Sequence, residues 1–71
     1  MNRWEREIVC LEEEHSFLTY RLRDLDRTEP NTDHGREYRR RLRADIAEVA
    51  KDLARAREMA ELVELMEEEA A

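Results

Sequence analysis

Apolar residues recur along the first part of the chain at alternating intervals of four and three residues. The repeat runs unbroken for three heptads and marks one face of an α-helix that packs against a partner helix. Its only polar member is His15. The members of this first seam are Trp4, Ile8, Leu11, His15, Leu18, Leu22 and Leu25. The pattern predicts a long amphipathic helix over about residues 2–28.

A second repeat of the same kind occupies the other half of the chain. Its members are Tyr38, Leu42, Ile46, Val49, Leu53, Ala56 and Ala60. Between the repeats stands Pro30, which has no backbone donor and disfavours helical geometry in the preceding residue. The sequence therefore predicts a turn at about 29–32 and a second helix over about 33–70.

Both predicted helices have capping residues at their starts. Asn2 is followed three residues later by Glu5, a variant of the capping box. Asn31, Thr32 and Asp33 are all competent N-caps for the second helix. These signals place the start of each helix a few residues before the first member of its apolar repeat.

The short connection favours antiparallel neighbours. Folding the helices together about Pro30 sets Leu18 opposite Leu42, and Trp4 opposite Ala56 and Ala60. A large residue facing small ones fits a closely packed seam. The predicted fold is all-α: residues 1–71 form a single domain, a two-helix antiparallel hairpin of coiled-coil type.

The second helix is longer than the first, so its last turns are expected to extend past the start of helix one. Several apolar residues in or near these turns point away from the seam, and two more lie outside the seam of helix one. This predicted partner interface consists of Cys10, Phe17, Met59, Leu62, Val63, Leu65 and Met66. An apolar patch that a hairpin leaves uncovered favours association. We expect a homodimer that forms a four-helix bundle.

Composition narrows the remaining possibilities. Charged residues make up 45% of the 71 positions, with one Gly and one Pro, which excludes a turn-rich β fold. The single Cys10 forms no internal disulfide, and we expect a reduced, partly buried side chain. No apolar run reaches the ~20 residues that span a bilayer, and the N-terminus lacks the apolar core of a signal peptide. A cytoplasmic protein is expected.

The densest basic cluster follows the turn. Its members are Arg36, Arg39, Arg40, Arg41 and Arg43. Clustered arginines bind phosphate, although a net charge of −6 disfavours wrapping a long duplex. In length and layout the chain resembles the dimeric helical hairpins that regulate plasmid copy number, and this resemblance implies RNA binding. A small dimeric RNA- or DNA-binding regulator is the alternative function.

Glu12 and His15 have the Glu-x-x-His spacing with which helical bundles ligate metals. In these four residues the chain resembles the small encapsulated ferritins, which implies a metal site between assembled chains. Asp45 and Asp52 border the opposing seam, but the sequence has no second Glu-x-x-His. We expect no metal, and interpret His15 as a polar seam residue that sets register, with Asp45 or another subunit as its partner.

Catalysis has little support, because no nucleophile is placed beside a base and there is no Gly-rich phosphate loop. We therefore expect neither enzymatic activity nor a cofactor. The leading interpretation is a non-enzymatic helical interaction protein that self-associates and docks on a protein partner. Its role would be that of an adaptor, an assembly component or a small inhibitor or regulator.

Overall fold

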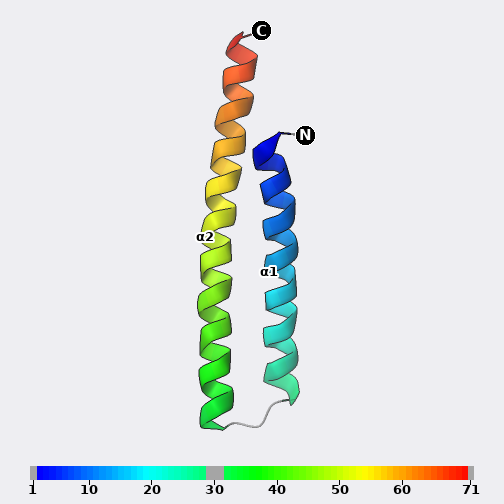
Figure 1. Ribbon diagram of the computed structural model, residues 1–71, viewed down its shortest axis with the longest axis vertical. Helices are drawn as coiled ribbons and strands as arrows, with labels where there is room; N and C mark the ends of the chain where they lie inside the picture. Colours follow the sequence, from blue (N-terminus) through cyan, green and yellow to red (C-terminus); the bar gives the residue numbers. More distant parts are fainter. Residues whose placement is uncertain (1, 29–31, 71) are drawn as a thin grey trace.

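The computed structural model describes residues 2–28 and 32–70, which form two α-helices in an antiparallel hairpin (Figure 1). Helix α1 runs over Arg3–Thr28 and helix α2 over Asp33–Ala70. The hairpin measures 58 × 15 × 13 Å. The predicted all-α hairpin is confirmed, whereas most of the predicted turn, including Pro30, lies outside the described residues.

Helix α1 begins with the predicted capping box. The Asn2 Oδ1 atom accepts a hydrogen bond from the Glu5 backbone N–H at 2.9 Å, and a Glu5 carboxylate oxygen accepts one from the Asn2 N–H at 3.3 Å. Each bond satisfies an N–H that has no partner within the helix. The acidic Glu5 also lies in the first turn, where the helix dipole favours negative charge.

Helix α2 is capped by Thr32. Its hydroxyl oxygen accepts a hydrogen bond from the Gly35 N–H at 3.0 Å, and its carbonyl oxygen accepts one from the Arg36 N–H at 2.9 Å. Of the three candidate caps, Thr32 therefore fills the position, Asp33 is the first helical residue, and Asn31 lies outside the described residues.

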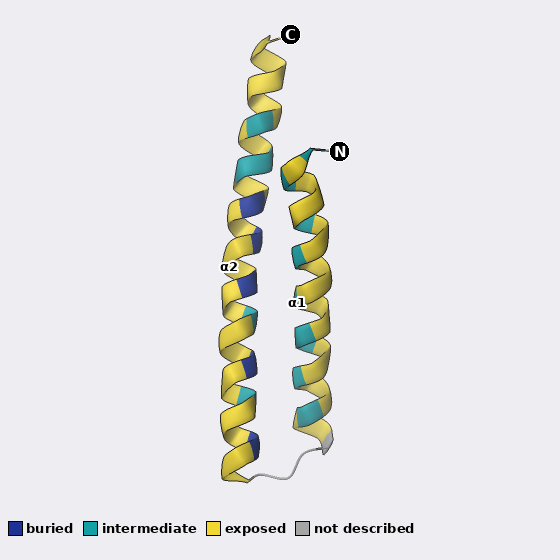
Figure 2. Cartoon of the chain, in the orientation of Figure 1, coloured by how far each residue is buried: buried dark blue, intermediate teal, exposed yellow. Residues whose placement is uncertain are grey.

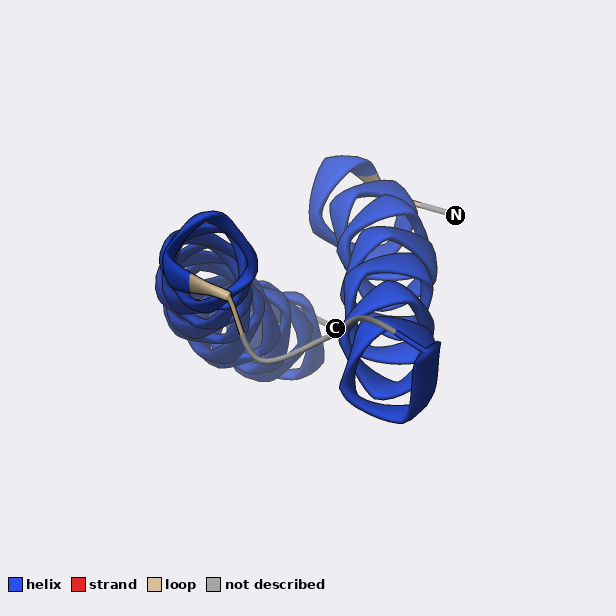
Figure 3. Ribbon diagram, turned by 90° about the horizontal axis from the view of Figure 1, so that it is seen from below, coloured by secondary structure: helices blue, strands red, loops and turns tan. Residues whose placement is uncertain are grey.

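The core of the hairpin is one narrow seam between the helices (Figure 2). Its buried apolar residues all belong to α2, and no large side chain among the described residues is fully buried. They are Leu42, Val49, Leu53 and Ala56. The facing residues of α1 are half-buried. Seen end-on, the two helices wind around one another, as a seven-residue apolar repeat requires (Figure 3).

The end of α2 extends beyond the start of α1 (Figure 1). Because Trp4 lies beside Ala56, the end of α2 from residue 61 to residue 70 extends past the start of α1, over about 15 Å at 1.5 Å per residue. We call residues 61–70 the overhang. Neither described helix combines the length and apolar content needed to cross a membrane.

The cap of α2 gives a direct test of this start site. Thr32→Ala removes the hydroxyl that accepts the Gly35 N–H, so the free energy of unfolding should fall by about 1 kcal/mol. Thr32→Ser keeps the acceptor and should stay close to the original protein. Urea unfolding followed by circular dichroism at fixed protein concentration measures both. Equal stability of the two variants would contradict the assigned cap.

Candidate interaction site

Apart from Tyr38, the predicted seam residues are buried or half-buried along the contact between the helices. On α1, all seven members from Trp4 to Leu25 are half-buried. On α2, Ile46 and Ala60 are half-buried, while the other predicted members from Leu42 to Ala56 are buried. The contact thus brings both repeats together but leaves the larger side chains of α1 partly open on their flanks.

The seam departs from the prediction near the turn. Tyr38 remains 37% exposed, and the next positions of the seam are filled by Arg39, which is half-buried, and by Gly35, which is buried. Counting back from Leu42 by three residues and then by four leads to Arg39 and Gly35, so the spacing contained the signal. Hydrophobicity favoured Tyr38 instead, although it lies at the edge of the seam.

Tyr38 makes a polar contact between the helices. Its hydroxyl oxygen accepts a hydrogen bond from Arg21 Nε at 2.8 Å, and the Arg21 guanidinium carbon lies 5.6 Å from the centre of the Tyr38 ring. A cation placed over an aromatic face is attracted to it. Tyr38 therefore joins the two helices through its edge rather than by burial in the seam.

Asp26 of α1 interacts with two arginines of α2. Its Oδ1 atom lies 3.7 Å from Arg39 Nε and 3.8 Å from Arg43 Nη2. The Arg39 side chain is only 11% exposed, so its aliphatic stem packs in the seam while its charged head reaches a carboxylate. This ion-pair group holds the turn end of the hairpin together.

The other arginines of the predicted nucleic-acid contact pair within α2. Arg40 Nη2 lies 2.6 Å from a Glu37 oxygen, and Arg41 Nε lies 3.8 Å from the other. Arg36 pairs with Asp33. All five arginines of the cluster thus have carboxylate partners, and their charge is partly neutralised. This arrangement is typical of a solvated helix surface with short-range ion pairs, and the nucleic-acid contact stays a prediction.

Glu12 of the Glu-x-x-His motif pairs with an arginine of the other helix. Arg57 Nη2 of α2 lies 3.4 Å from a Glu12 oxygen. Among residues 2–28 and 32–70, no group of three or more His, Cys, Asp or Glu side chains lies close enough to hold a metal. His15 lines a shallow groove with Glu12 and Arg57, and no hydrogen bond joins it to Asp45, so that predicted pairing is wrong within one chain.

Much of the predicted partner interface is exposed. In the overhang, Leu62, Leu65 and Met66 are 47%, 50% and 67% exposed, whereas Val63 and the preceding Met59 are half-buried. The three exposed side chains lie on the part of α2 that extends past the start of α1 (Figure 1). The apolar end of α2 therefore projects into solvent.

On α1, Phe17 is 63% exposed. Cys10, one heptad before Phe17, is also exposed, against the expectation of a partly buried thiol. Val9 and Tyr20, which the apolar repeat did not single out, are exposed as well. Both lie outside the intervals of four and three residues that define the seam, so the repeat gave no signal for them.

The exposed area of the whole chain is large for its mass. The hairpin exposes 5906 Å², whereas a compact monomer of 8.6 kDa is expected to expose about 4,700 Å². The excess, about 1,200 Å², exceeds the roughly 800 Å² that each partner contributes to a standard interface. The excess reflects the elongated shape of the hairpin, which measures 58 × 15 × 13 Å.

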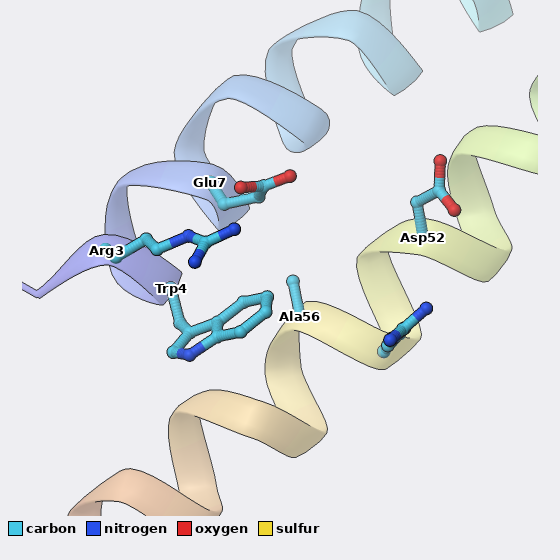
Figure 4. Close-up of a pocket in the computed structure, with 6 residues that line it drawn as sticks. Arg3, Trp4, Glu7, Asp52 and Ala56 are labelled. Carbon is cyan, nitrogen blue, oxygen red and sulfur yellow. The ribbon is translucent and has the colours of Figure 1, made fainter.

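Two shallow grooves follow one flank of the hairpin. The N-terminal groove is closed on one side by Trp4, whose ring lies against Ala56 (Figure 4). The guanidinium carbon of Arg3 lies 5.0 Å from the centre of the Trp4 ring. Glu7 and Asp52 also line this groove. The turn-end groove has an apolar wall instead. Its residues are Phe17, Leu18 and Arg21 from α1, and Tyr38, Arg41, Leu42 and Asp45 from α2.

Comparison of the chain with protein-family models, with curated proteins and with solved structures found no match. The open flanks of the seam, the overhang and the turn-end groove are therefore the observations that bear on function.

The ion pairs of Asp26 and Glu37 provide a matched comparison. Asp26→Ala removes a carboxylate that joins the two helices and faces the nearly buried Arg39, so we expect a loss of about 1 kcal/mol in the free energy of unfolding. Glu37→Ala removes pairs within one exposed helix and should cost less than about 0.5 kcal/mol. Urea unfolding at low and high salt checks both. A larger loss for Glu37→Ala would contradict this assignment.

His15 is a polar interruption of the seam, and no hydrogen bond or ion pair joins it to another residue of 2–28 or 32–70. His15→Leu should raise the melting temperature, by about 4–8 °C if the gain is near 1 kcal/mol, and should loosen oligomer specificity. Thermal unfolding and sedimentation measure the two effects. The exposed His34→Leu is the control and should leave the melting temperature unchanged. A marked fall in the melting temperature of His15→Leu would overturn this interpretation.

Proposed function

We propose that the protein is a non-enzymatic helical interaction protein of the cytoplasm that self-associates and docks on a protein partner. Its role would be that of an adaptor, an assembly component or a small inhibitor or regulator of a larger machine. The observation that carries this proposal is the uncovered apolar surface of the overhang, where Leu62, Leu65 and Met66 are about half exposed or more.

A single seam gives the hairpin little to bury. The described core has four apolar residues on α2, and the α1 residues that face them remain half-buried. Most of the stability of a helix in water comes from packing its apolar face. A second hairpin on the open flank would therefore increase the buried area of every seam residue that it covered. Self-association is thus the simplest source of further stability.

Exposed apolar residues on both helices support a second contact. The overhang of α2 carries Leu62 and Leu65, and Tyr20 is exposed on α1. One self-association surface leaves some of these residues uncovered. A protein partner that covers them would bury apolar surface while the glutamates of the overhang pair with its basic groups.

We also propose that the protein is not an enzyme. Among the described residues, neither His15 nor His34 has a hydrogen bond to Ser16 or Cys10 that would activate a nucleophile. The grooves are shallow and open, unlike the enclosed pockets in which ligands are held for chemistry.

Sedimentation equilibrium tests self-association. We expect a mass of at least twice 8.6 kDa at micromolar concentration, and a loss of helical circular dichroism as dilution separates the chains. A fully helical monomer at micromolar concentration would defeat the self-association proposal.

A further inference from the structure

The apolar residues near the overhang have the same helical spacing as the α2 wall of the turn-end groove. Met59, Leu62, Val63 and Met66 form a set that we call the apolar stripe. The groove residues of α2 are Tyr38, Arg41, Leu42 and Asp45. Each stripe residue lies three heptads after its counterpart in the groove. In helices that supercoil with a seven-residue repeat, residues separated by whole heptads stay on the same flank.

The position of these two sets along α2 is symmetric. Asp52 lies midway between them and also at the middle of α2, which spans Asp33–Ala70. A twofold axis that crosses the flank at the level of Asp52 therefore brings the stripe of each copy to the groove of the other. Both contacts form at once, and the two α2 helices overlap along their full length.

The two ends of the hairpin carry opposite charge. The overhang contains five glutamates and no basic residue, whereas residues 32–43 contain five arginines and two acidic residues. Copies packed with their turns together would set like charges beside each other. Copies packed with their turns apart set the acidic overhang beside the basic turn end, which is the favourable arrangement.

We propose that two copies of this chain form an antiparallel dimer with their turns apart. The overhang of each copy lies in the turn-end groove of the other, between α1 and α2. This inference rests on the proposed self-association and adds its surface and orientation. Phe17 and Tyr38 supply the apolar wall of the groove, while Arg21 and Arg41 face the glutamates that flank the stripe.

The exposed area agrees with this arrangement. The hairpin exposes about 1,200 Å² more than a compact chain of its mass, and a standard interface covers about 800 Å² of each partner. The overhang extends past the start of its own α1, so the groove of a second copy replaces the missing neighbour. The contact is isologous and closes on itself, which is the commonest symmetry of homo-oligomers.

Two leucines of the overhang form a matched pair for testing the surface. Leu62 belongs to the apolar stripe, whereas Leu65 is equally exposed but lies outside the stripe, about 60° around α2 from Leu62 at 3.6 residues per turn. Leu62→Glu should raise the dimer dissociation constant about a hundredfold or more, because each dimer contains two copies of the contact. Leu65→Glu should change it about twofold or less. Sedimentation equilibrium of the full chain, with circular dichroism as a check on helicity, measures both.

A distance measurement tests the orientation without disturbing the stripe. In a Cys10→Ser background, Glu68→Cys places one spin label near the end of the overhang. Pulsed electron resonance should give a separation of roughly 50 Å between the labels of a turns-apart dimer, at 1.5 Å per helical residue. Turns packed together would give roughly 10–20 Å, the spacing of helices within one bundle.

The outcomes separate this inference from the proposed function. A monomeric wild-type protein overturns both. A dimer with the short label distance, or one in which Leu62→Glu and Leu65→Glu act equally, overturns the antiparallel arrangement and leaves self-association standing. The long distance together with selective weakening by Leu62→Glu supports the proposed dimer.

Discussion

The hairpin depends on a single constraint, that two helices share one seam. Each helix presents one apolar face to the other, and nothing among the described residues covers the flanks of that contact. The residues that become buried are on α2 and include small side chains such as Val49 and Ala56. The larger side chains of α1, among them Trp4 and Leu18, reach across this seam but stay half-buried because no third helix closes over them. Burial is thus limited by the number of helices rather than by the sequence of either one.

The heptad spacing and the capping residues were sufficient to predict the hairpin. Regular intervals of four and three residues specify a helical face, and the Asn2–Glu5 box is a local interaction that needs no knowledge of the fold. Thr32 was one of three equivalent candidates, and only the path of the chain into α2 selects it.

Other features depended on details that the apolar pattern does not carry. Tyr38 was expected in the seam on grounds of hydrophobicity, yet Arg39 occupies that line because its long stem packs there while its guanidinium reaches Asp26. The exposed Cys10 and the lack of a described partner for His15 were missed for a related reason, since burial and side-chain pairing depend on which flanks a partner helix covers. Association through the exposed apolar residues depends on the surface of a second molecule, which the sequence of one chain does not specify.

The interactions that join the two helices are unevenly distributed along the hairpin. Near the turn, Asp26 pairs with two arginines of α2, and Arg21 donates to Tyr38. At the opposite end the contact is the Trp4 ring against Ala56. Added salt screens ion pairs but has little effect on an apolar contact. Ionic strength therefore weakens the contact between the helices mainly near the turn.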